Sequence, residues 1–170
     1  MTTPKAAAAT PKPPNVGDKA PPLELVTGKG SDGRPTLFRL QDAVRQGPVI
    51  VAFFPGAFTS TCADEMACFS RDWNTYESTG AQFIGVSVDS VPSLRAWKDK
   101  HGDKVPFGSD FEKEATRDWG LLDSFWWGQV AKRATFVVDR NGIVTYAEVL
   151  SNADLEPSYD DVQAAIKRAK

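Results

Sequence analysis

The sequence has 170 residues, 41% of them hydrophobic, and a formal net charge of -2. This content suffices for the core of one domain, and no apolar run approaches the roughly 20 residues that a membrane-spanning helix needs. The small net charge gives no electrostatic reason to expect binding to nucleic acid or to an anionic membrane.

The first segment, residues 1–15, is rich in Ala, Pro, Thr and Lys. Such a composition buries little apolar surface, so it predicts a mobile tail ahead of a single domain over residues 16–170. Residues 1–15 do not show the pattern of a secretory signal, which is a basic segment followed by an apolar segment and a cleavage site, so we expect a cytoplasmic protein. Two cysteines in such a protein are poor evidence for a structural disulfide and are more typical of reactive, metal-binding or inert thiols.

From Pro22 onward the chain alternates between strand-like and helix-like segments. The apolar run PVIVAFF, residues 48–54, is typical of a strand buried on both faces of a sheet. After it, apolar residues at helical spacing predict one helix from Thr59 to about Ser78. In chain order the expected elements are strands at 23–26 and 36–40, a helical turn at 41–45, a strand at 48–54, a helix at 59–78, a strand at 81–89, a helix at 91–101, a strand and a helix within 107–120, two strands joined by a turn at 140–142, and a helix from 157 to the C-terminus.

Residues 121–132 have no clear period and contain the aromatic cluster Phe125, Trp126 and Trp127. This cluster, together with Phe58, has three interpretations: an apolar collar near a site, a contact between two copies of the chain, or core packing of an irregular segment. The order of the other elements predicts an α/β fold with a mixed central sheet and helices on both faces.

Cys62 lies in the first turn of the helix that Thr59 begins. The first N–H groups of a helix have no partner inside the helix, and the helix dipole favours negative charge there. A thiolate at this position is therefore stabilised, and a nearby cation would add to the effect. The only histidine, His101, belongs to another predicted helix, so an arginine is the better candidate for that cation.

Pro55, Thr59 and Cys62 form the pattern P-x-x-x-T-x-x-C directly after a buried strand. This pattern resembles the active-site motif of the peroxiredoxins, which are thiol peroxidases with a thioredoxin-like fold. The segment RATFVVDRNGIV, which begins at Arg133, resembles the arginine-bearing strand of the same family. The likeness extends from about Val16 to the C-terminus and is nearest to the bacterioferritin-comigratory and alkyl hydroperoxide reductase E branches.

The resemblance implies a role for each matching residue. Cys62 would attack hydrogen peroxide or an organic hydroperoxide and become a sulfenic acid. Thr59 would offer its hydroxyl to the peroxide, Arg133 would bind both thiolate and peroxide, and Pro55 would shield the sulfur. Glu65 matches one branch of the family, but it also fits a helix-capping glutamate. A cofactor is not implied, and thioredoxin or another dithiol is the expected reductant.

Cys68 follows Cys62 by six residues, whereas the bacterioferritin-comigratory branch places its second cysteine five residues after the first. In an intact helix six residues span about 9 Å, which leaves the Cα atoms near 10 Å apart, beyond the roughly 7 Å limit for a disulfide. Cys68 could thus resolve Cys62 only if the start of the helix unwinds. The alternatives are a buried Cys68 and a one-cysteine mechanism in which an external thiol resolves Cys62.

Other functions fit the sequence less well. A thioredoxin-type oxidoreductase would need C-x-x-C, which is absent, and two cysteines with one distant histidine do not match the spacing of a zinc site. A third possible function is that of a binding module on the same fold, in which Cys62 is inert. A homodimer is a further expectation from the exposed aromatic residues.

Overall fold

The computed structural model describes residues 10–101 and 104–169. Residues 1–9 of the predicted tail lie outside the described residues. In the rest of that segment Pro14 is buried, and the backbone of Lys12 and Pro13 lies against Gly120. The boundary predicted at residue 15 stays a prediction.

The centre of the molecule is a seven-stranded mixed sheet with the strand order β2-β1-β5-β4-β3-β8-β9. The middle strands β5, β4 and β3 are parallel, and the pairs on either side of them are antiparallel. The strands of this sheet are β1 (Glu24–Lys29), β2 (Pro35–Arg39), β3 (Val49–Phe53), β4 (Gln82–Ser87), β5 (Phe107–Ser109), β8 (Ala134–Val138) and β9 (Val144–Val149). The predicted α/β class and mixed sheet are confirmed.

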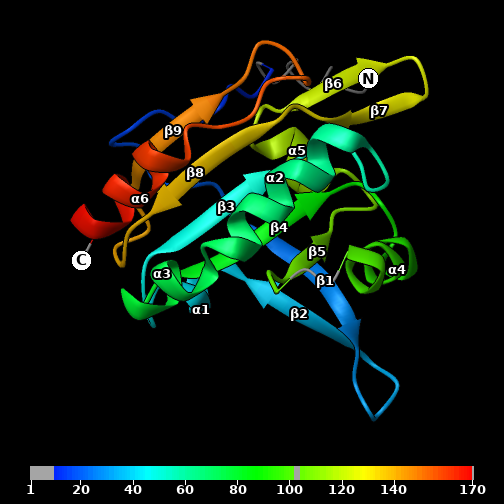
Figure 1. The fold of residues 1–170 in the computed structure, drawn as a ribbon, viewed down its shortest axis with the longest axis horizontal. Coiled ribbons are helices and arrows are strands. Elements are labelled where there is room, and N and C mark those ends of the chain that lie inside the picture. Colours follow the sequence, from blue (N-terminus) through cyan, green and yellow to red (C-terminus); the bar gives the residue numbers. More distant parts are fainter. Residues whose placement is uncertain (1–9, 102–103, 170) are drawn as a thin grey trace, which may run out of the picture.

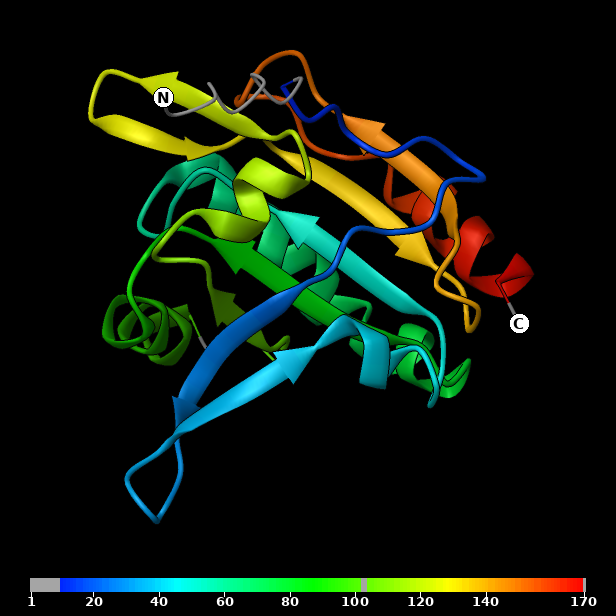
Figure 2. The same ribbon diagram turned by 180° about the vertical axis from the view of Figure 1, so that it is seen from behind.

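Helices cover both faces of the sheet (Figures 1 and 2). The helices are α1 (Leu40–Ala43), α2 (Ser60–Arg71), α3 (Trp73–Ser78), α4 (Val91–His101), α5 (Glu114–Asp118) and α6 (Tyr159–Arg168). Because side chains alternate along a strand, Val51 and Phe53 of β3 pack toward α1 and α5, while Ile50 and Ala52 pack toward the other helices. Every residue of β3 is buried, as the apolar run predicts.

The predicted helix over residues 59–78 is wrong in one respect, because it is two helices. Asp72 separates α2 from α3, and its carboxylate accepts hydrogen bonds from Arg71. The backbone carbonyl of Asp72 accepts the N–H of Thr75, so a new turn begins there. The Asp72 side chain does not cap α3, and it accepts a further hydrogen bond from the Gln163 amide over 3.4 Å. The apolar period continues across the break, which is why it did not reveal the break.

The unassigned segment 121–132 is an antiparallel hairpin of β6 (Leu122–Phe125) and β7 (Gly128–Ala131). It stands beyond one edge of the helical layer, close to the start of α2 in both views (Figures 1 and 2). Trp126 and Trp127 form its turn, and Trp126 is 92% exposed. In the part of the chain that the structure describes, none of the helices has the length and apolar character to cross a membrane.

Candidate active site

The loop between β3 and α2 carries the first two motif residues, Pro55 and Thr59. Its backbone is held by the segment that follows β4, because the N–H of Ala57 donates to Asp89 Oδ2 over 2.7 Å. Phe58 has a φ of 63°, in the left-handed region that a residue with a side chain rarely adopts. The hydroxyl of Thr59 donates to the carbonyl of Gly56 over 3.0 Å, so it closes the loop and does not cap the helix.

Helix α2 begins at Ser60, which places Cys62 in its first turn, as expected. The first helical hydrogen bond runs from the N–H of Ala63 to the carbonyl of Thr59. The N–H groups of Ser60, Thr61 and Cys62 therefore precede the helical ladder and are available to a ligand. The Cys62 side chain is only 1% exposed, so its sulfur lies in a low-dielectric environment where nearby charges act strongly.

Arg133 immediately precedes β8 and is the cation beside Cys62. Its Nη2 donates to Cys62 Sγ over 3.3 Å, and both side chains are buried. The same guanidinium donates to the carbonyl of Ala153 from Nε over 3.2 Å and from Nη2 over 2.8 Å. Burial opposes its charge, but Glu65 and Cys62 outweigh this effect and hold the pKa of Arg133 above its ordinary range.

Glu65 lies one helical turn after Cys62 and pairs with Arg133, whose Nη1 donates to Glu65 Oε2. It is completely buried, and its Oε1 has no hydrogen-bond partner among the described residues. Burial raises the pKa of Glu65 to about 7, although the charge and hydrogen bond of Arg133 act in the opposite direction. Among the described residues the Glu65 side chain pairs with Arg133 and makes no hydrogen bond that caps the start of α2.

The two cysteines lie at opposite ends of α2, which is unbroken between them. Cys62 is buried and Cys68 is partly exposed, and both are free thiols. The structure thus brings Cys62, Glu65 and Arg133 into one group, with Pro55 and Thr59 on the adjoining loop. It leaves Cys68 outside this group.

A pocket of about 620 Å³ adjoins the loop. Its lining includes Pro55 and Thr59 of the loop, together with Trp126 and Trp127 of the β6–β7 hairpin. The remaining lining is mixed, with Phe111 and Val88 as apolar members and Lys113 and Asp89 as charged ones. The pocket lies within the size range of small-molecule sites, far above the volume of hydrogen peroxide.

Asp89 is a structural participant that the sequence reasoning missed. Its Oδ2 accepts hydrogen bonds from Ala57 N–H and from the hydroxyl of Ser87, while its carbonyl accepts the hydroxyl of Ser109. The sequence did contain a signal for Asp89, because this residue follows β4 just as the motif follows the neighbouring parallel strand β3. The ends of adjacent parallel strands meet at the same edge of a sheet. The carbonyl of Ala153, in contrast, has no side-chain signature in the sequence.

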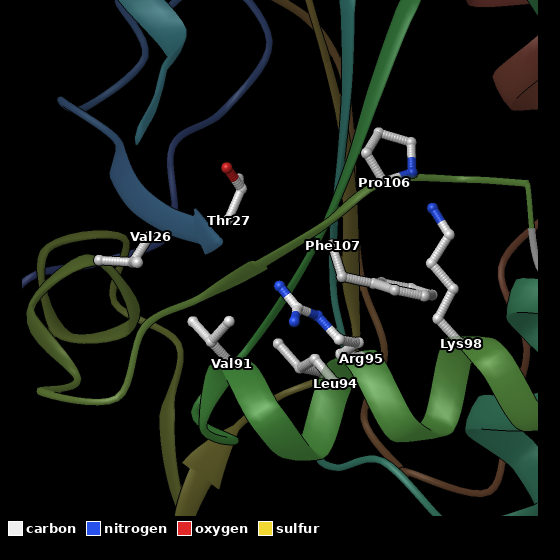
Figure 3. A pocket seen from close by; sticks show the side chains of 8 residues that line it. All are labelled: Val26, Thr27, Val91, Leu94, Arg95, Lys98, Pro106 and Phe107. Carbon is white, nitrogen blue, oxygen red and sulfur yellow. The ribbon is translucent and has the colours of Figure 1, made fainter. Parts of the chain in front are cut away.

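A second pocket, of about 180 Å³, lies between α4, β1 and β5 (Figure 3). Arg95 and Lys98 project from α4 along it, and the ring of Phe107 extends from β5 toward that helix (Figure 3). It shares none of its lining residues with the pocket beside Pro55 and Thr59. Of the two pockets, only the larger one adjoins the loop that leads into Cys62, and Cys62 itself lines neither.

Comparison with known proteins matches residues 16–147 to the model of the AhpC/TSA family. The chain is 30% identical to Peroxiredoxin 2 of Thermoplasma acidophilum over 158 residues, which cover 89% of this chain and 74% of the relative. It is also 30% identical to the chloroplastic Peroxiredoxin Q of Sedum lineare, over 83% of this chain and 70% of the relative. Among solved structures, the reduced 2-Cys peroxiredoxin of Plasmodium vivax superimposes with a TM-score of 0.78 at 27% identity, over 91% of this chain and 81% of that one.

Proposed function

The chain belongs to the AhpC/TSA family and is a peroxiredoxin, a thiol-dependent peroxidase, and from this premise we propose that Cys62 is its peroxide-reducing nucleophile. The observation that supports this most directly is the 3.3 Å contact between Arg133 Nη2 and Cys62 Sγ inside the protein. A buried cation beside a sulfur at a helix start favours the thiolate, which is the reactive form.

The reaction follows from these contacts. The Cys62 thiolate attacks the terminal peroxide oxygen, the O–O bond breaks, and the leaving oxygen takes up a proton to become water or an alcohol. Cys62 is then a sulfenic acid. Thr59 and the free N–H groups of the first turn of α2 are placed to orient the peroxide, and Arg133 to stabilise charge on the leaving oxygen. Pro55 has no N–H and would shield the sulfur.

Peroxide consumption with dithiothreitol as reductant tests this assignment. We expect turnover by the native chain and by Cys68→Ser, and none by Cys62→Ser. Dithiothreitol can resolve the sulfenic acid itself, so the Cys68 variant is a matched control that also removes one thiol. If Cys62→Ser keeps its activity, Cys62 is not the nucleophile.

For the second half of the cycle we propose that the Cys68 thiol attacks the Cys62 sulfenic sulfur and releases water, which forms an intrachain disulfide. This step needs the first turn of α2 to unwind, since the unbroken helix keeps the two cysteines too far apart. Two features favour unwinding: α2 has no side-chain cap at its N-terminus, and its first turn has no acidic residue. A thioredoxin-type dithiol would then reduce the disulfide.

The alternative is a one-cysteine cycle in which an external thiol resolves Cys62. Peptide mapping after one equivalent of peroxide separates the two cycles. A crosslink between residues 62 and 68 within one chain supports resolution by Cys68, whereas sulfenic acid or mixed disulfides at Cys62 alone support the external thiol. The homodimer and the cytoplasmic location expected from the sequence stay proposals.

A further inference from the structure

The guanidinium of Arg133 is held from two independent elements. Helix α2 supplies Glu65 and Cys62 on one side. The loop between β9 and α6, residues 150–158, supplies the carbonyl of Ala153 on the other side, which accepts hydrogen bonds from both Nε and Nη2. An arginine has five N–H donors, and these contacts occupy four of them. One Nη1 N–H has no hydrogen-bond partner among the described residues.

The loop is itself firmly attached at both ends. At its start the N–H of Leu150 donates to the backbone carbonyl of Arg133 over 3.0 Å, so Arg133 binds this loop through both its backbone and its side chain. At its end the N–H of Ser158 donates to Glu148 Oε2 over 3.0 Å, and Pro157 is buried. A carbonyl on such a segment is preorganised, because its position does not depend on the bond it makes.

Asn152 shapes the turn that aims this carbonyl. Its Oδ1 accepts the N–H of Asp154 over 2.9 Å, and its backbone carbonyl accepts the N–H of Leu155 over 3.2 Å. These two bonds bracket Ala153 and fix the orientation of the intervening peptide units. The Asn152 side chain is exposed, so its substitution removes a turn contact without opening a cavity.

We propose that the β9–α6 loop is the fixed half of a clamp on Arg133, with the Ala153 carbonyl as the positioning group and Asn152 as the positioning residue that aims it. The loop that carries Ala153 is not part of α2, so its two hydrogen bonds to Arg133 do not require the first turn of that helix. Arg133 therefore stays in place when the start of α2 unwinds, and it is ready to receive Cys62 when the helix reforms. The catalytic consequence rests on the proposed role of Cys62, but the clamp itself does not.

The clamp is tested without peroxide by following the Arg133 Nε–H signal in the ¹⁵N NMR spectrum, assigned through its loss in Arg133→Lys. We expect a protected signal in the native chain and in Glu65→Gln, where Ala153 still holds the Nε–H. In Asn152→Ala its hydrogen exchange should be at least about tenfold faster, the scale of one lost hydrogen bond. Asn152→Ser, which keeps a short side-chain acceptor, should restore much of the protection. Asn141→Ala is the control, because Asn141 is an exposed asparagine in the turn between β8 and β9.

The proposal is overturned if exchange at Nε–H is unchanged in Asn152→Ala, or if Glu65→Gln alone abolishes the protection. Peroxidase assays of the same variants add the functional readout. Asn152→Ala should lower the rate constant with peroxide about tenfold and move the pH at half-maximal rate upward, while Asn152→Ser and Asn141→Ala should not. If Cys62 is not the nucleophile, the peroxidase rates of these variants no longer report on the position of Arg133. The hydrogen exchange of the Arg133 Nε–H still shows whether the Ala153 carbonyl holds the guanidinium.

Discussion

The two ends of helix α2 each carry one cysteine, and their surroundings are opposite in kind. At the N-terminal end Cys62 is 1% exposed and contacts a buried guanidinium. At the C-terminal end Cys68 is partly exposed, in the last turn before the helix stops at Asp72. The salt bridge at that end joins the exposed Arg71 to the half-buried Asp72, and water screens it at least in part.

This difference separates two chemical demands. A nucleophile must be held as an anion and kept from stray oxidation, which favours burial beside a cation. A resolving thiol must instead be reachable once the other cysteine has moved. The two thiols lie on the same helix, but one is buried beside a cation and the other is partly exposed, so substitutions at the two ends should have different effects.

The largest effect is expected from the cation at the Cys62 end. Arg133→Met removes the charge that faces the sulfur and one donor to the leaving oxygen, so the rate constant with peroxide should fall about 100- to 1000-fold. The same variant leaves Glu65 buried without its partner, which can cost about 3–5 kcal/mol of folding stability. The double variant Arg133→Met/Glu65→Gln avoids that cost and should show the same loss of rate. Stopped-flow measurement of peroxide reduction provides the comparison.

The control is Arg140→Met, because Arg140 is an exposed arginine in the hairpin that follows β8. Its rate should equal that of the native chain. A double variant that is folded and fully active would mean that the guanidinium has no part in catalysis.

At the other end of α2, Cys68→Ser should leave the first turnover unchanged and slow later ones. With a thioredoxin system as reductant we expect at least a roughly tenfold lower steady-state rate, because the sulfenic acid has no internal partner. Mass spectrometry should also find more sulfinic acid at Cys62. Ala67→Ser, an exposed neighbour on the same turn, is the matched control. Equal steady-state rates for the native chain and Cys68→Ser would favour the one-cysteine cycle.

Glu65 gives the Cys62 end a pH dependence near neutrality. Since burial raises the pKa of Glu65 to about 7 from an ordinary value of 4.5, the folded state favours the protonated acid. This contribution is complete below pH 4.5 and is lost as the pH rises through about 7. It corresponds to roughly 3 kcal/mol. Glu65→Gln should therefore be more stable than the native chain at pH 8, and the difference should vanish near pH 4.5.

Urea unfolding at pH 4.5, 6, 7 and 8 measures this trend, with Glu114→Gln as an exposed control. The opposite sign at pH 8, with Glu65→Gln less stable, would mean that the charged pair with Arg133 stabilises the fold more than burial of the carboxylate costs.

Most of the fold was predictable from local patterns. The run at 48–54 identified the central strand because a strand buried on both faces must be apolar throughout. The turn at Arg140 to Gly142 identified the β8–β9 hairpin. The break at Asp72 was missed because the apolar stripe continues across it. The β6–β7 hairpin was missed because its aromatic residues face a pocket and solvent, so they follow no core period.

For the site, the motif predicted Pro55, Thr59 and Cys62, and a likeness in a distant strand predicted Arg133, which the fold brings next to Cys62. The contacts that hold these residues in position could not be predicted from a local sequence motif. The carbonyl of Ala153 is a backbone group that any residue could supply, and Asp89 acts through a contact 32 positions away in the sequence. Long-range contacts of this kind depend on the packing of the sheet, which a local pattern does not encode.

The smallest effect is expected from the pocket, which adjoins only the Cys62 end of the helix. Trp126→Ala removes an exposed ring that lines the same pocket as Pro55 and Thr59. A bulky apolar hydroperoxide that buries about 40 Å² of this ring gains about 1 kcal/mol, so its KM should rise about fivefold. Hydrogen peroxide is too small to reach the ring, so its KM should not change, nor should either KM in Leu37→Ala, which removes an exposed side chain on β2. Assays with cumene hydroperoxide and hydrogen peroxide measure both KM values, and sedimentation analysis measures the oligomeric state. Together they distinguish a role of Trp126 in the substrate pocket from a role in a contact between two copies of the chain. If Trp126→Ala instead converts a dimer to a monomer and lowers both activities equally, the ring is a contact between copies and not part of the substrate pocket.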